Sequence, residues 1–268
     1  RALRHLDPAF VSVTYGAGGT TRELTHEAVG AIRKRAGIDV AAHLTCVDAS
    51  RSETLDIAER YAEAGVSRIV ALRGDPPKGA AGFSPRADGF QSSVDLVAAL
   101  AETGKFDIAV GAYPDPHPEA AYEGADIDWL KRKIDAGATS AITQFFFDAD
   151  VFFRFRDRCA AAGIDAPIIP GILPIQSWNG VKSFAKRCGT TVPLALERAF
   201  ETAERDGRTD LLALTQCTTL CTRLIENGAG HLHFYTLNKP ELTRDERIQR
   251  RFLRRRRDWG LLGDLFGG

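Results

Sequence analysis

The sequence predicts an α/β protein, a (β/α)8 barrel of the TIM-barrel type that forms one domain over residues 1–268. Short apolar runs alternate with stretches of helical period along the chain, which indicates parallel strands joined by right-handed crossovers. The units repeat roughly every 30–35 residues, the spacing of strand–helix–strand units. Seven apolar runs are visible where a closed barrel needs eight strands. We therefore expect the first strand, and most of the first helix, to lie upstream of residue 1.

The predicted strands are the apolar runs themselves, because a strand buried on both faces has a continuous apolar sequence. They span residues 10–14, 40–46, 68–72, 108–113, 141–145, 168–173 and 231–236. The predicted helices span residues 21–35, 52–64, 92–102, 126–136, 149–162, 177–188, 193–204 and 209–227. Ser52 and Thr209 are expected to cap two helices at their amino ends. Glycines just past four helices are expected at the carboxyl-terminal caps: Gly37, Gly65, Gly137 and Gly163.

An open, doubly wound sheet is the alternative architecture for alternating strands and helices. Sheets of that kind that bind dinucleotides carry a GxGxxG turn after the first strand. The nearest feature in this chain, YGAGG at residues 15–19, lacks that spacing. The barrel is therefore the preferred prediction.

Composition and charge are those of an ordinary soluble globular protein. The chain is 44% hydrophobic and 26% charged, with no net charge, which argues against a general attraction to nucleic acid or membrane surfaces. No apolar run approaches the ~18–20 residues that a membrane-spanning helix needs. Five cysteines without a CxxC pair favour reduced thiols and a cytoplasmic location. The arginine-rich stretch at 244–257, within a basic extension at 241–268, is interpreted as a solvated helix or tail.

Polar, aromatic and glycine residues gather at the predicted carboxyl ends of the strands, where barrel enzymes place their active sites. The clearest case is Arg73-Gly74-Asp75, in which glycine allows a sharp turn between a guanidinium and a carboxylate. The chain has no HExxH segment, no serine-centred elbow and no strand-end lysine for a Schiff base. This pattern disfavours a metal site and covalent catalysis, and it favours binding of a large planar ligand.

Eight segments together resemble the methylenetetrahydrofolate reductase family, in the same order from about residue 10 to 240. They are FVSVTYGA at 10–17, HLTC at 43–46, ALRGD at 71–75, YPDPHPE at 113–119, LKRK with DAGA at 130–138, TQFFFD at 143–148, PGILP at 170–174 and HFYTLN at 233–238. A phosphate-binding isomerase or aldolase would account for a barrel but not for TQFFFD or HFYTLN. The family fold is a (β/α)8 barrel that binds FAD, in agreement with the predicted architecture.

The resemblance implies a reaction. NADH or NADPH reduces FAD, and the reduced flavin passes hydride to 5,10-methylenetetrahydrofolate to give 5-methyltetrahydrofolate. One pocket serves both half-reactions by turns, which is a ping-pong mechanism. The flavin performs the redox chemistry, while the protein orients and tunes it. The resemblance also implies a homo-oligomer that acts on a small molecule and has neither nucleic acid nor membrane as a partner.

The resemblance assigns two catalytic residues. Asp75 matches a strand-end aspartate near flavin and pterin, where a negative charge disfavours the anionic reduced flavin and stabilises the iminium cation formed when the folate ring opens. Gln144 matches a glutamine that hydrogen-bonds the pterin and the nicotinamide amide. Expected cofactor contacts are Thr14, Tyr15, Ala17, His43, Arg73, Gly74, Asp75, Ser93, Tyr113, His117, Ala120, Asp126, Arg132 and Lys133. Expected substrate contacts are Asp75, Gln144, Phe184, Tyr235 and Lys239.

Some of these assignments have a simple physical basis. Arg132 and Lys133 can meet a pyrophosphate, and Asp126 can accept hydrogen bonds from ribose hydroxyls. Without the resemblance, Arg132 and Lys133 would be interpreted as a solvated helix face, and His117 as a loop histidine. Thr14 is expected to face the nicotinamide.

Two departures from the family pattern keep alternatives open. The family's catalytic glutamate lies on the first strand, in a Phe-Glu-Phe-Phe-Pro-Pro segment that is expected upstream of residue 1. A Tyr-Ala pair that lines the flavin in the family is replaced here by Ser92-Ser93. A flavin-free reductase of the same substrate, or a non-catalytic barrel that binds folate or flavin, would also fit these departures.

Overall fold

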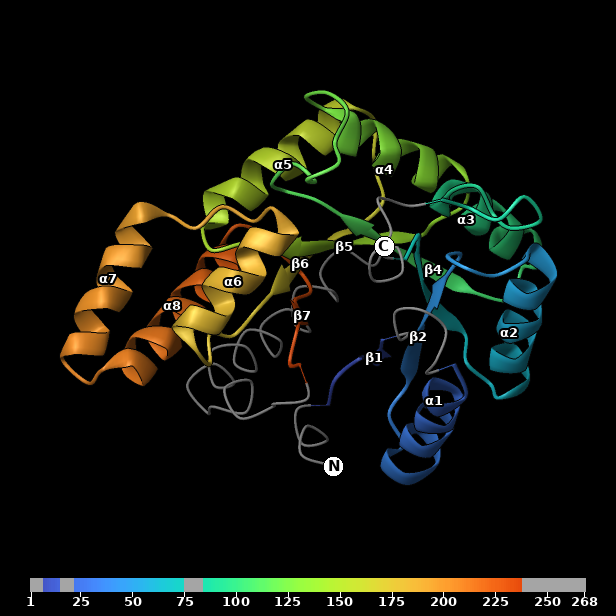
Figure 1. Ribbon diagram of the computed structural model, residues 1–268, viewed down its shortest axis with the longest axis horizontal. Coiled ribbons are helices and arrows are strands. Elements are labelled where there is room, and N and C mark those ends of the chain that lie inside the picture. The colour runs from blue at the N-terminus through green and yellow to red at the C-terminus, as the bar shows by residue number, and fades with distance from the viewer. Residues whose placement is uncertain (1–6, 15–21, 75–83, 238–268) are drawn as a thin grey trace, which may run out of the picture.

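The structure of the protein, a computed structural model, describes residues 7–14, 22–74 and 84–237 (Figure 1). Within them lie seven strands and eight helices. The strands are β1 (Val11–Val13), β2 (Val40–Thr45), β3 (Arg68–Leu72), β4 (Asp107–Ala112), β5 (Ser140–Phe145), β6 (Ile168–Ile172) and β7 (His233–Phe234). The helices are α1 (Arg22–Ala36), α2 (Arg51–Glu63), α3 (Ser93–Glu102), α4 (Ala125–Asp135), α5 (Ala149–Ala161), α6 (Trp178–Cys188), α7 (Leu194–Arg205) and α8 (Thr209–Glu226). Every predicted element is present, with ends that differ from the prediction by at most two residues.

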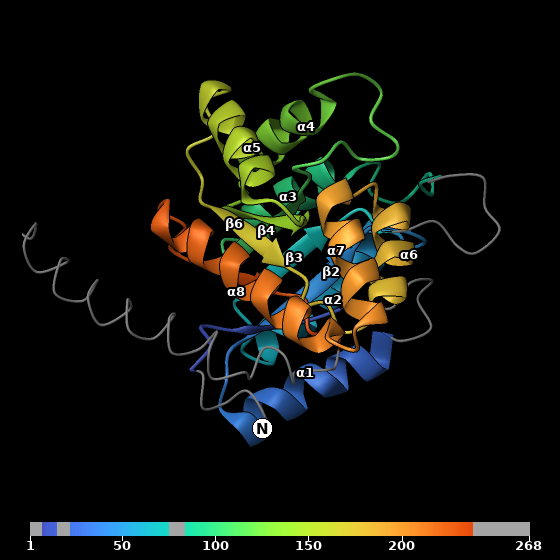
Figure 2. The same ribbon diagram turned by 90° about the vertical axis from the view of Figure 1, so that its left-hand side faces the viewer.

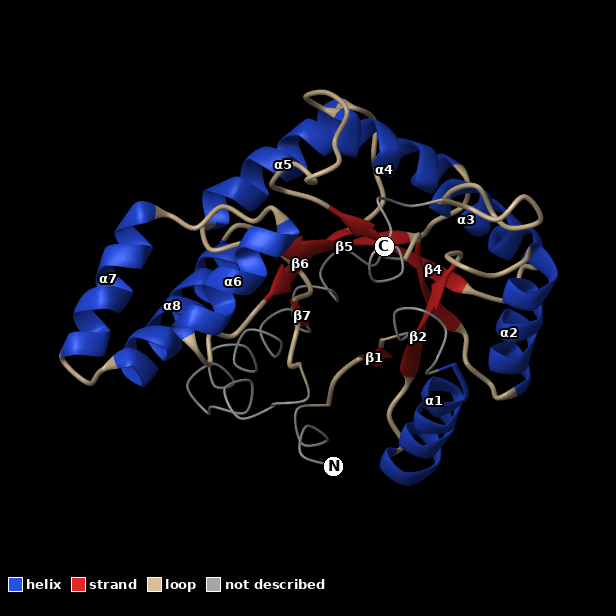
Figure 3. Ribbon diagram, viewed as in Figure 1, coloured by secondary structure: helices blue, strands red, loops and turns tan. Residues whose placement is uncertain are grey.

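The strands form one parallel sheet in the order β1 to β7, each paired with the next along the chain. A doubly wound sheet would reverse its strand order at a switch point, so the sequential order confirms the barrel over that alternative. The sheet curls with α1 to α5 outside it, which brings β1 and β7 towards each other (Figures 1 and 3). The described residues thus form a (β/α)8 barrel from which one strand is absent, between β7 and β1.

Side chains alternate between the two faces of this curled sheet, as they do along any strand. The outer face packs against α1 to α5 and forms the main core, which includes Val40, Ala42, Leu44, Ile69, Ala71, Ile108, Val110 and Ala141. The inner face carries a smaller apolar cluster: Ala41, Val70 and Ile142, with Phe10, Leu72, Ala109, Ile169 and Tyr235 against it. These residues define the inner face. Residues two or four positions further along each strand lie on the same face, closer to the carboxyl ends of the strands.

Three helices, α6, α7 and α8, follow β6 before the chain returns to β7. Trp178 on α6 and Phe200 on α7 stack at 4.2 Å between ring centroids, in a second core that also contains Phe145. Helix α8 packs against α5, α7 and β6 (Figure 2). These contacts support the β6–β7 side of the sheet. None of the described helices is long and apolar enough to cross a bilayer.

The helix ends correct one part of the sequence prediction. The amino-terminal cap of α2 is Ser50, not Ser52: its Oγ accepts from the Glu53 N–H at 3.1 Å, and the Glu53 carboxylate accepts from the Ser50 N–H at 2.8 Å. Helix α8 is capped by Arg208 without a side-chain hydrogen bond, so the cap expected at Thr209 is also wrong. The expected capping glycines are confirmed, with φ of +61°, +74°, +113° and +72° at Gly37, Gly65, Gly137 and Gly163.

Candidate active site

Four of the predicted site residues lie on the inner face of the barrel. His43, Tyr113 and Gln144 follow the inner-face residues Ala41, Ala109 and Ile142 by two or four positions. Tyr235 belongs to the inner cluster itself. Tyr113 and Tyr235 come directly after β4 and β7, Gln144 is one residue before the end of β5, and His43 is two residues before the end of β2. The structure therefore brings an imidazole, two phenols and an amide together at the end where barrel enzymes bind substrates.

Tyr235 is held in place by the backbone of β5 and by a glycine in β6. Its Oη donates to the carbonyl oxygen of Thr143 at 2.8 Å. A Cβ at Gly171 would lie 2.1 Å from that same oxygen and 2.7 Å from Cε2 of Tyr235, so a side chain at position 171 has no room. Burial raises the pKa of Tyr235 far above its usual value, with smaller contributions from Tyr113 and Cys188. Tyr235 is therefore a neutral hydrogen-bond donor.

Two histidines occupy the inner face without charge. Burial, with a smaller contribution from His233, lowers the pKa of His43 from 6.5 to about 4. Burial likewise lowers the pKa of His233 to about 4. The Nε2 of His233 lies 3.4 Å from the Ser12 hydroxyl, and its ring meets that of Tyr235 at 5.1 Å. His233 thus links β7 to β1, a role that the sequence analysis did not assign.

Gln144 is the predicted catalytic residue that the structure describes. Its side-chain oxygen accepts from the N–H of Phe145 at 3.1 Å. The described part of the chain places no acceptor on its NH2 group, so that group retains two donors. The predicted substrate contact Phe184 stacks at 5.2 Å on Phe145, the next residue of β5, whose side chain belongs to the second core and not to the inner cluster.

The turn after β3 requires the glycine that the sequence analysis singled out. Gly74 has φ +89°, and a Cβ there would lie 2.5 Å from Cγ1 of Val47. The carbonyl oxygen of Arg73 accepts from the Cys46 thiol at 3.3 Å. Burial raises the pKa of Cys46 to about 11, so this sulfur stays protonated at neutral pH. The turn after β3 is thus packed directly on the turn after β2.

The loop after β4 is organised around His117. Its backbone N–H donates to Oδ2 of Asp126 at 3.0 Å, and its Nδ1 accepts from the Glu119 N–H at 3.0 Å. Its carbonyl oxygen accepts from the Ala120 N–H at 2.8 Å, and its ring meets Tyr113 edge-on at 4.7 Å. His117 is therefore a fixed residue next to the inner face.

Arg132 and Lys133 lie in different environments, although both were expected to meet one pyrophosphate. Arg132 is exposed, and its guanidinium lies over the Trp129 ring at 5.2 Å. Lys133 is only 8% exposed, and its Nζ donates to the Gly111 carbonyl at 2.5 Å. Burial lowers the pKa of Lys133 from 10.5 to about 8, while Asp126 acts in the opposite direction. The solvated helix face, which is the interpretation without the resemblance, is thus right for Arg132 and wrong for Lys133.

The remaining predicted site residues lie either at the edge of the barrel or outside the described residues. Ser93 is the half-buried first residue of α3, directly after its cap Ser92, whose Oγ accepts from the Asp95 N–H at 3.3 Å. Thr14 follows the inner-face residue Ser12 by two positions and is exposed. Four predicted residues lie outside the described residues: Tyr15, Ala17, Asp75 and Lys239.

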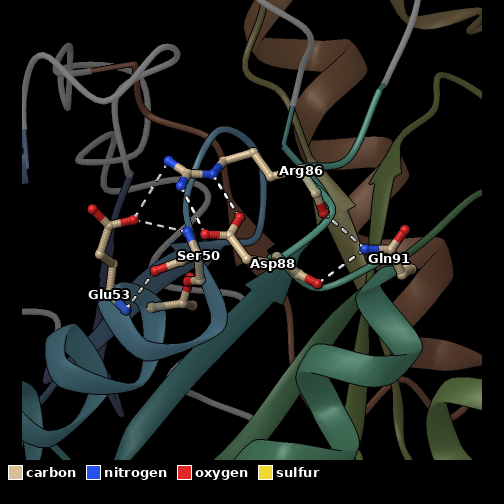
Figure 4. Close-up of polar contacts among 7 residues, drawn as sticks. Ser50, Glu53, Arg86, Asp88 and Gln91 are labelled. Atoms are coloured by element: carbon tan, nitrogen blue, oxygen red, sulfur yellow. Dashed lines mark hydrogen bonds and ion pairs between the residues drawn. The ribbon is translucent and has the colours of Figure 1, made fainter.

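A network that the sequence analysis missed ties the amino end of α2 to residues 84–92 (Figure 4). Arg86 donates to both oxygens of Asp88, at 2.9 and 2.8 Å, and lies 3.9 Å from the carboxylate of Glu53. Gln91 donates to the carbonyls of Arg86 and Gly89, at 2.9 and 3.0 Å. The available signal was the Ser-x-x-Glu pattern of a capping box, which begins at Ser50.

Comparison with known proteins gives a consistent result. A family model described as methylenetetrahydrofolate reductase matches residues 1–248. The 5,10-methylenetetrahydrofolate reductases of Pectobacterium carotovorum and Escherichia coli are each 45% identical to the chain over 242 residues, which cover 90% of this chain and 79% and 80% of theirs. A rice protein named probable methylenetetrahydrofolate reductase (NADH) is 35% identical over 86% of this chain and 41% of its own length.

Solved structures resemble the chain more distantly. A Clostridium thermocellum protein, described as uncharacterized and as binding two copies of 5-methyl-5,6,7,8-tetrahydrofolic acid, aligns with a TM-score of 0.46 and 16% identity, over 92% of this chain and 95% of that one. A 2,3-dimethylmalate lyase aligns with a TM-score of 0.46 and 15% identity, over 85% and 90% of the two chains.

Proposed function

The chain belongs to the methylenetetrahydrofolate reductase family, and from that membership we propose that it reduces 5,10-methylenetetrahydrofolate to 5-methyltetrahydrofolate with NADH or NADPH. The observation that supports this most is the 45% identity that extends over about four fifths of the bacterial enzymes. The geometry is compatible with it, because the family's specific TQFFFD segment places Gln144 on the inner face at the end of β5. We further propose a cytoplasmic homo-oligomer.

Gln144 is proposed to bind both the pterin of the folate and the carboxamide of the nicotinamide. Each of these ligands presents acceptors and donors in one plane, and a neutral amide can serve both. Phe184 and Tyr235 are proposed to line the substrate position, where the Tyr235 ring forms part of the wall while its single O–H donates to the Thr143 carbonyl. Asp75 follows Gly74 directly, and its carboxylate is proposed to stabilise the cation that develops on the opening folate ring.

We propose FAD as the cofactor because two described features suit its parts, one the planar flavin ring and the other the anionic pyrophosphate. The inner wall near the carboxyl ends offers three rings, from His43, Tyr113 and Tyr235, and burial keeps those of His43 and Tyr235 uncharged. Lys133 supplies a buried cation that donates to the Gly111 carbonyl and interacts with the charge of Asp126, and a bound anion nearby would further offset its desolvation. FAD, when bound, would supply hydride transfer between NAD(P)H and the folate, which we propose occupy the site in turn.

The first test of this function is the complete reaction together with one substitution. Purified protein supplied with FAD, NADH or NADPH, and 5,10-methylenetetrahydrofolate should form 5-methyltetrahydrofolate, measured by chromatography. Gln144→Glu should lower kcat/KM for the folate by about 10- to 100-fold, because a carboxylate loses the two amide donors, a cost of ~1.4–2.7 kcal/mol. It should leave FAD affinity within threefold. No product with either nicotinamide would refute the reaction, and unchanged folate kinetics would refute the role of Gln144.

A second prediction concerns Lys133. Lys133→Met should weaken FAD binding at least tenfold, or ~1.4 kcal/mol, because it removes the buried cation. The same substitution should stabilise the ligand-free protein at pH 7, since the folded-state pKa of about 8 lies below the ordinary 10.5. The cost of burying the charge applies in full below pH 8 and disappears as the pH rises towards 10.5. Thermal unfolding across this range measures it.

Lys131→Met is the matched control for this prediction. Lys131 lies two residues away on α4 and pairs with Asp135 at the surface. Lys131→Met should change neither the affinity for FAD nor the pH dependence of the free energy of unfolding by a measurable amount. A Lys133→Met protein that binds FAD as tightly as the parent would remove Lys133 from the cofactor site.

A further inference from the structure

The side chain of Glu119, to which no role has been assigned, joins the loops at the carboxyl ends of β3 and β4. Nη1 of Arg73 donates to Oε2 of Glu119 at 2.7 Å, across 46 positions of sequence. Arg73 directly follows β3, and Glu119 lies in the loop that follows β4. The hydrogen bond and the charge of Arg73 both lower the pKa of the Glu119 carboxyl. The bond thus joins two neighbouring loops at the mouth of the barrel.

The backbone of Glu119 also holds His117, which is the second residue here that is proposed to contact FAD. The N–H of Glu119 donates to Nδ1 of His117 at 3.0 Å. A ring nitrogen that accepts a hydrogen bond carries no proton, so the neutral imidazole holds its proton on Nε2. His117 is also held from the opposite side, where its own N–H donates to Asp126 at 3.0 Å. One residue therefore sets the position of a guanidinium and the tautomer of an imidazole.

We infer that Glu119 is a positioning residue, which holds Arg73 through its carboxylate and His117 through its backbone N–H in the geometry that binds the cofactor. The inference rests on the proposed function, in which Arg73 and His117 contact FAD. Glu119 itself carries a negative charge and is half exposed, with 50% of its side chain accessible. A carboxylate is a poor direct ligand for a pyrophosphate, because like charges repel. Its contribution to binding is therefore through Arg73.

The experiment separates positioning from charge by comparing two substitutions. Glu119→Gln keeps an oxygen that accepts from Arg73 but removes the charge, whereas Glu119→Ala removes both. A positioning role predicts that Glu119→Ala weakens FAD binding at least tenfold and that Glu119→Gln stays within threefold of the parent. If Glu119 acted only as a repelling charge, both substitutions would tighten FAD binding to the same extent, and the inference would be wrong. Dissociation constants come from flavin fluorescence.

A matched control exists at the opposite end of the same two strands. Arg68 and Asp107 form an ion pair at 2.7 Å between the amino ends of β3 and β4, with similar exposure of 40% and 43%. Asp107→Ala should leave FAD affinity unchanged. A double-mutant cycle completes the test: in an Arg73→Met background, Glu119→Ala should cost nothing further. A full additional loss there would show that Glu119 acts independently of Arg73.

Nuclear magnetic resonance of the ligand-free protein distinguishes failure of this inference from failure of the proposed function. The guanidinium of Arg73 should be ordered in the parent protein and in Asp107→Ala, and mobile in Glu119→Ala. The His117 ring should show the Nε2–H tautomer. A parent protein that binds no flavin would refute the cofactor, and the resonances would still decide whether Glu119 holds Arg73 and His117. A guanidinium equally mobile with and without Glu119 would overturn the inference.

Discussion

Acidification from pH 7.5 to pH 4.5 is expected to remove several kcal/mol of folding free energy through His43 and His233. Their pKa values in the folded protein are about 4, below the ordinary 6.5, chiefly because both rings are buried. Between pH 6.5 and 4, these two histidines therefore bind protons in the unfolded chain but remain neutral in the folded protein. The contribution to stability is complete above pH 6.5 and is lost as the pH falls through this window. It amounts to roughly 3 kcal/mol for each histidine.

Urea unfolding at pH 7.5 and 4.5 measures this effect in the parent protein and in variants. His233→Asn should reduce the pH dependence of the free energy of unfolding by more than the contribution of His233 alone. The reason is that the charge of His233 also lowers the pKa of His43. His231→Asn, an exposed substitution two residues away, controls for the loss of a histidine from this segment. If His231→Asn reduced the pH dependence as much as His233→Asn does, burial would not be its cause.

Gly171→Ala is expected to be among the most damaging single substitutions in the described part of the chain. The added Cβ would lie 2.1 Å from the Thr143 carbonyl oxygen, a backbone atom that cannot move without disturbing β5. The same oxygen accepts the hydrogen bond of Tyr235. We expect a loss of about 3 kcal/mol or more in the free energy of unfolding. Tyr235 should also be displaced, which near-ultraviolet circular dichroism would detect.

Gly30→Ala is the matched control for this overpacking. Gly30 lies in the interior of α1, and a Cβ there meets nothing within 4 Å. Since alanine has the higher helix propensity, this substitution should stabilise the protein by about 0.5–1 kcal/mol. Equal stability of Gly171→Ala and the parent would mean that β5 and β6 can separate, and that Tyr235 does not depend on this glycine.

The fold could be predicted from the sequence because its signals are local. Each buried parallel strand is a continuous apolar run, and glycines such as Gly65 and Gly163 mark where a helix ends. The errors were local as well. Ser52 and Ser50 both precede the apolar pattern of α2, and only the position of Glu53 three residues after Ser50 identifies the cap.

The candidate site was predictable where it follows from strand alternation and unpredictable where it depends on tertiary contacts. The inner-face position of Gln144 follows from its spacing relative to Ile142. The burial of Lys133 does not, because adjacent residues of α4 point in different directions, and only the packing of α4 places Arg132 in solvent and Lys133 against Gly111. The bond between Arg73 and Glu119 joins loops whose separation in space only the fold determines.

The order of the sheet also bears on how the protein is made. Because every ladder of the described sheet joins consecutive strands, each strand from β2 to β7 finds its earlier partner already synthesised when it leaves the ribosome. Assembly can therefore keep pace with translation, which proceeds at ~5–20 residues per second. The growing sheet nevertheless has two unpaired edges, since among the described strands β1 has no earlier neighbour and the newest strand has no later one. Either edge can pair with other chains, so the growing polypeptide is open to aggregation during its synthesis.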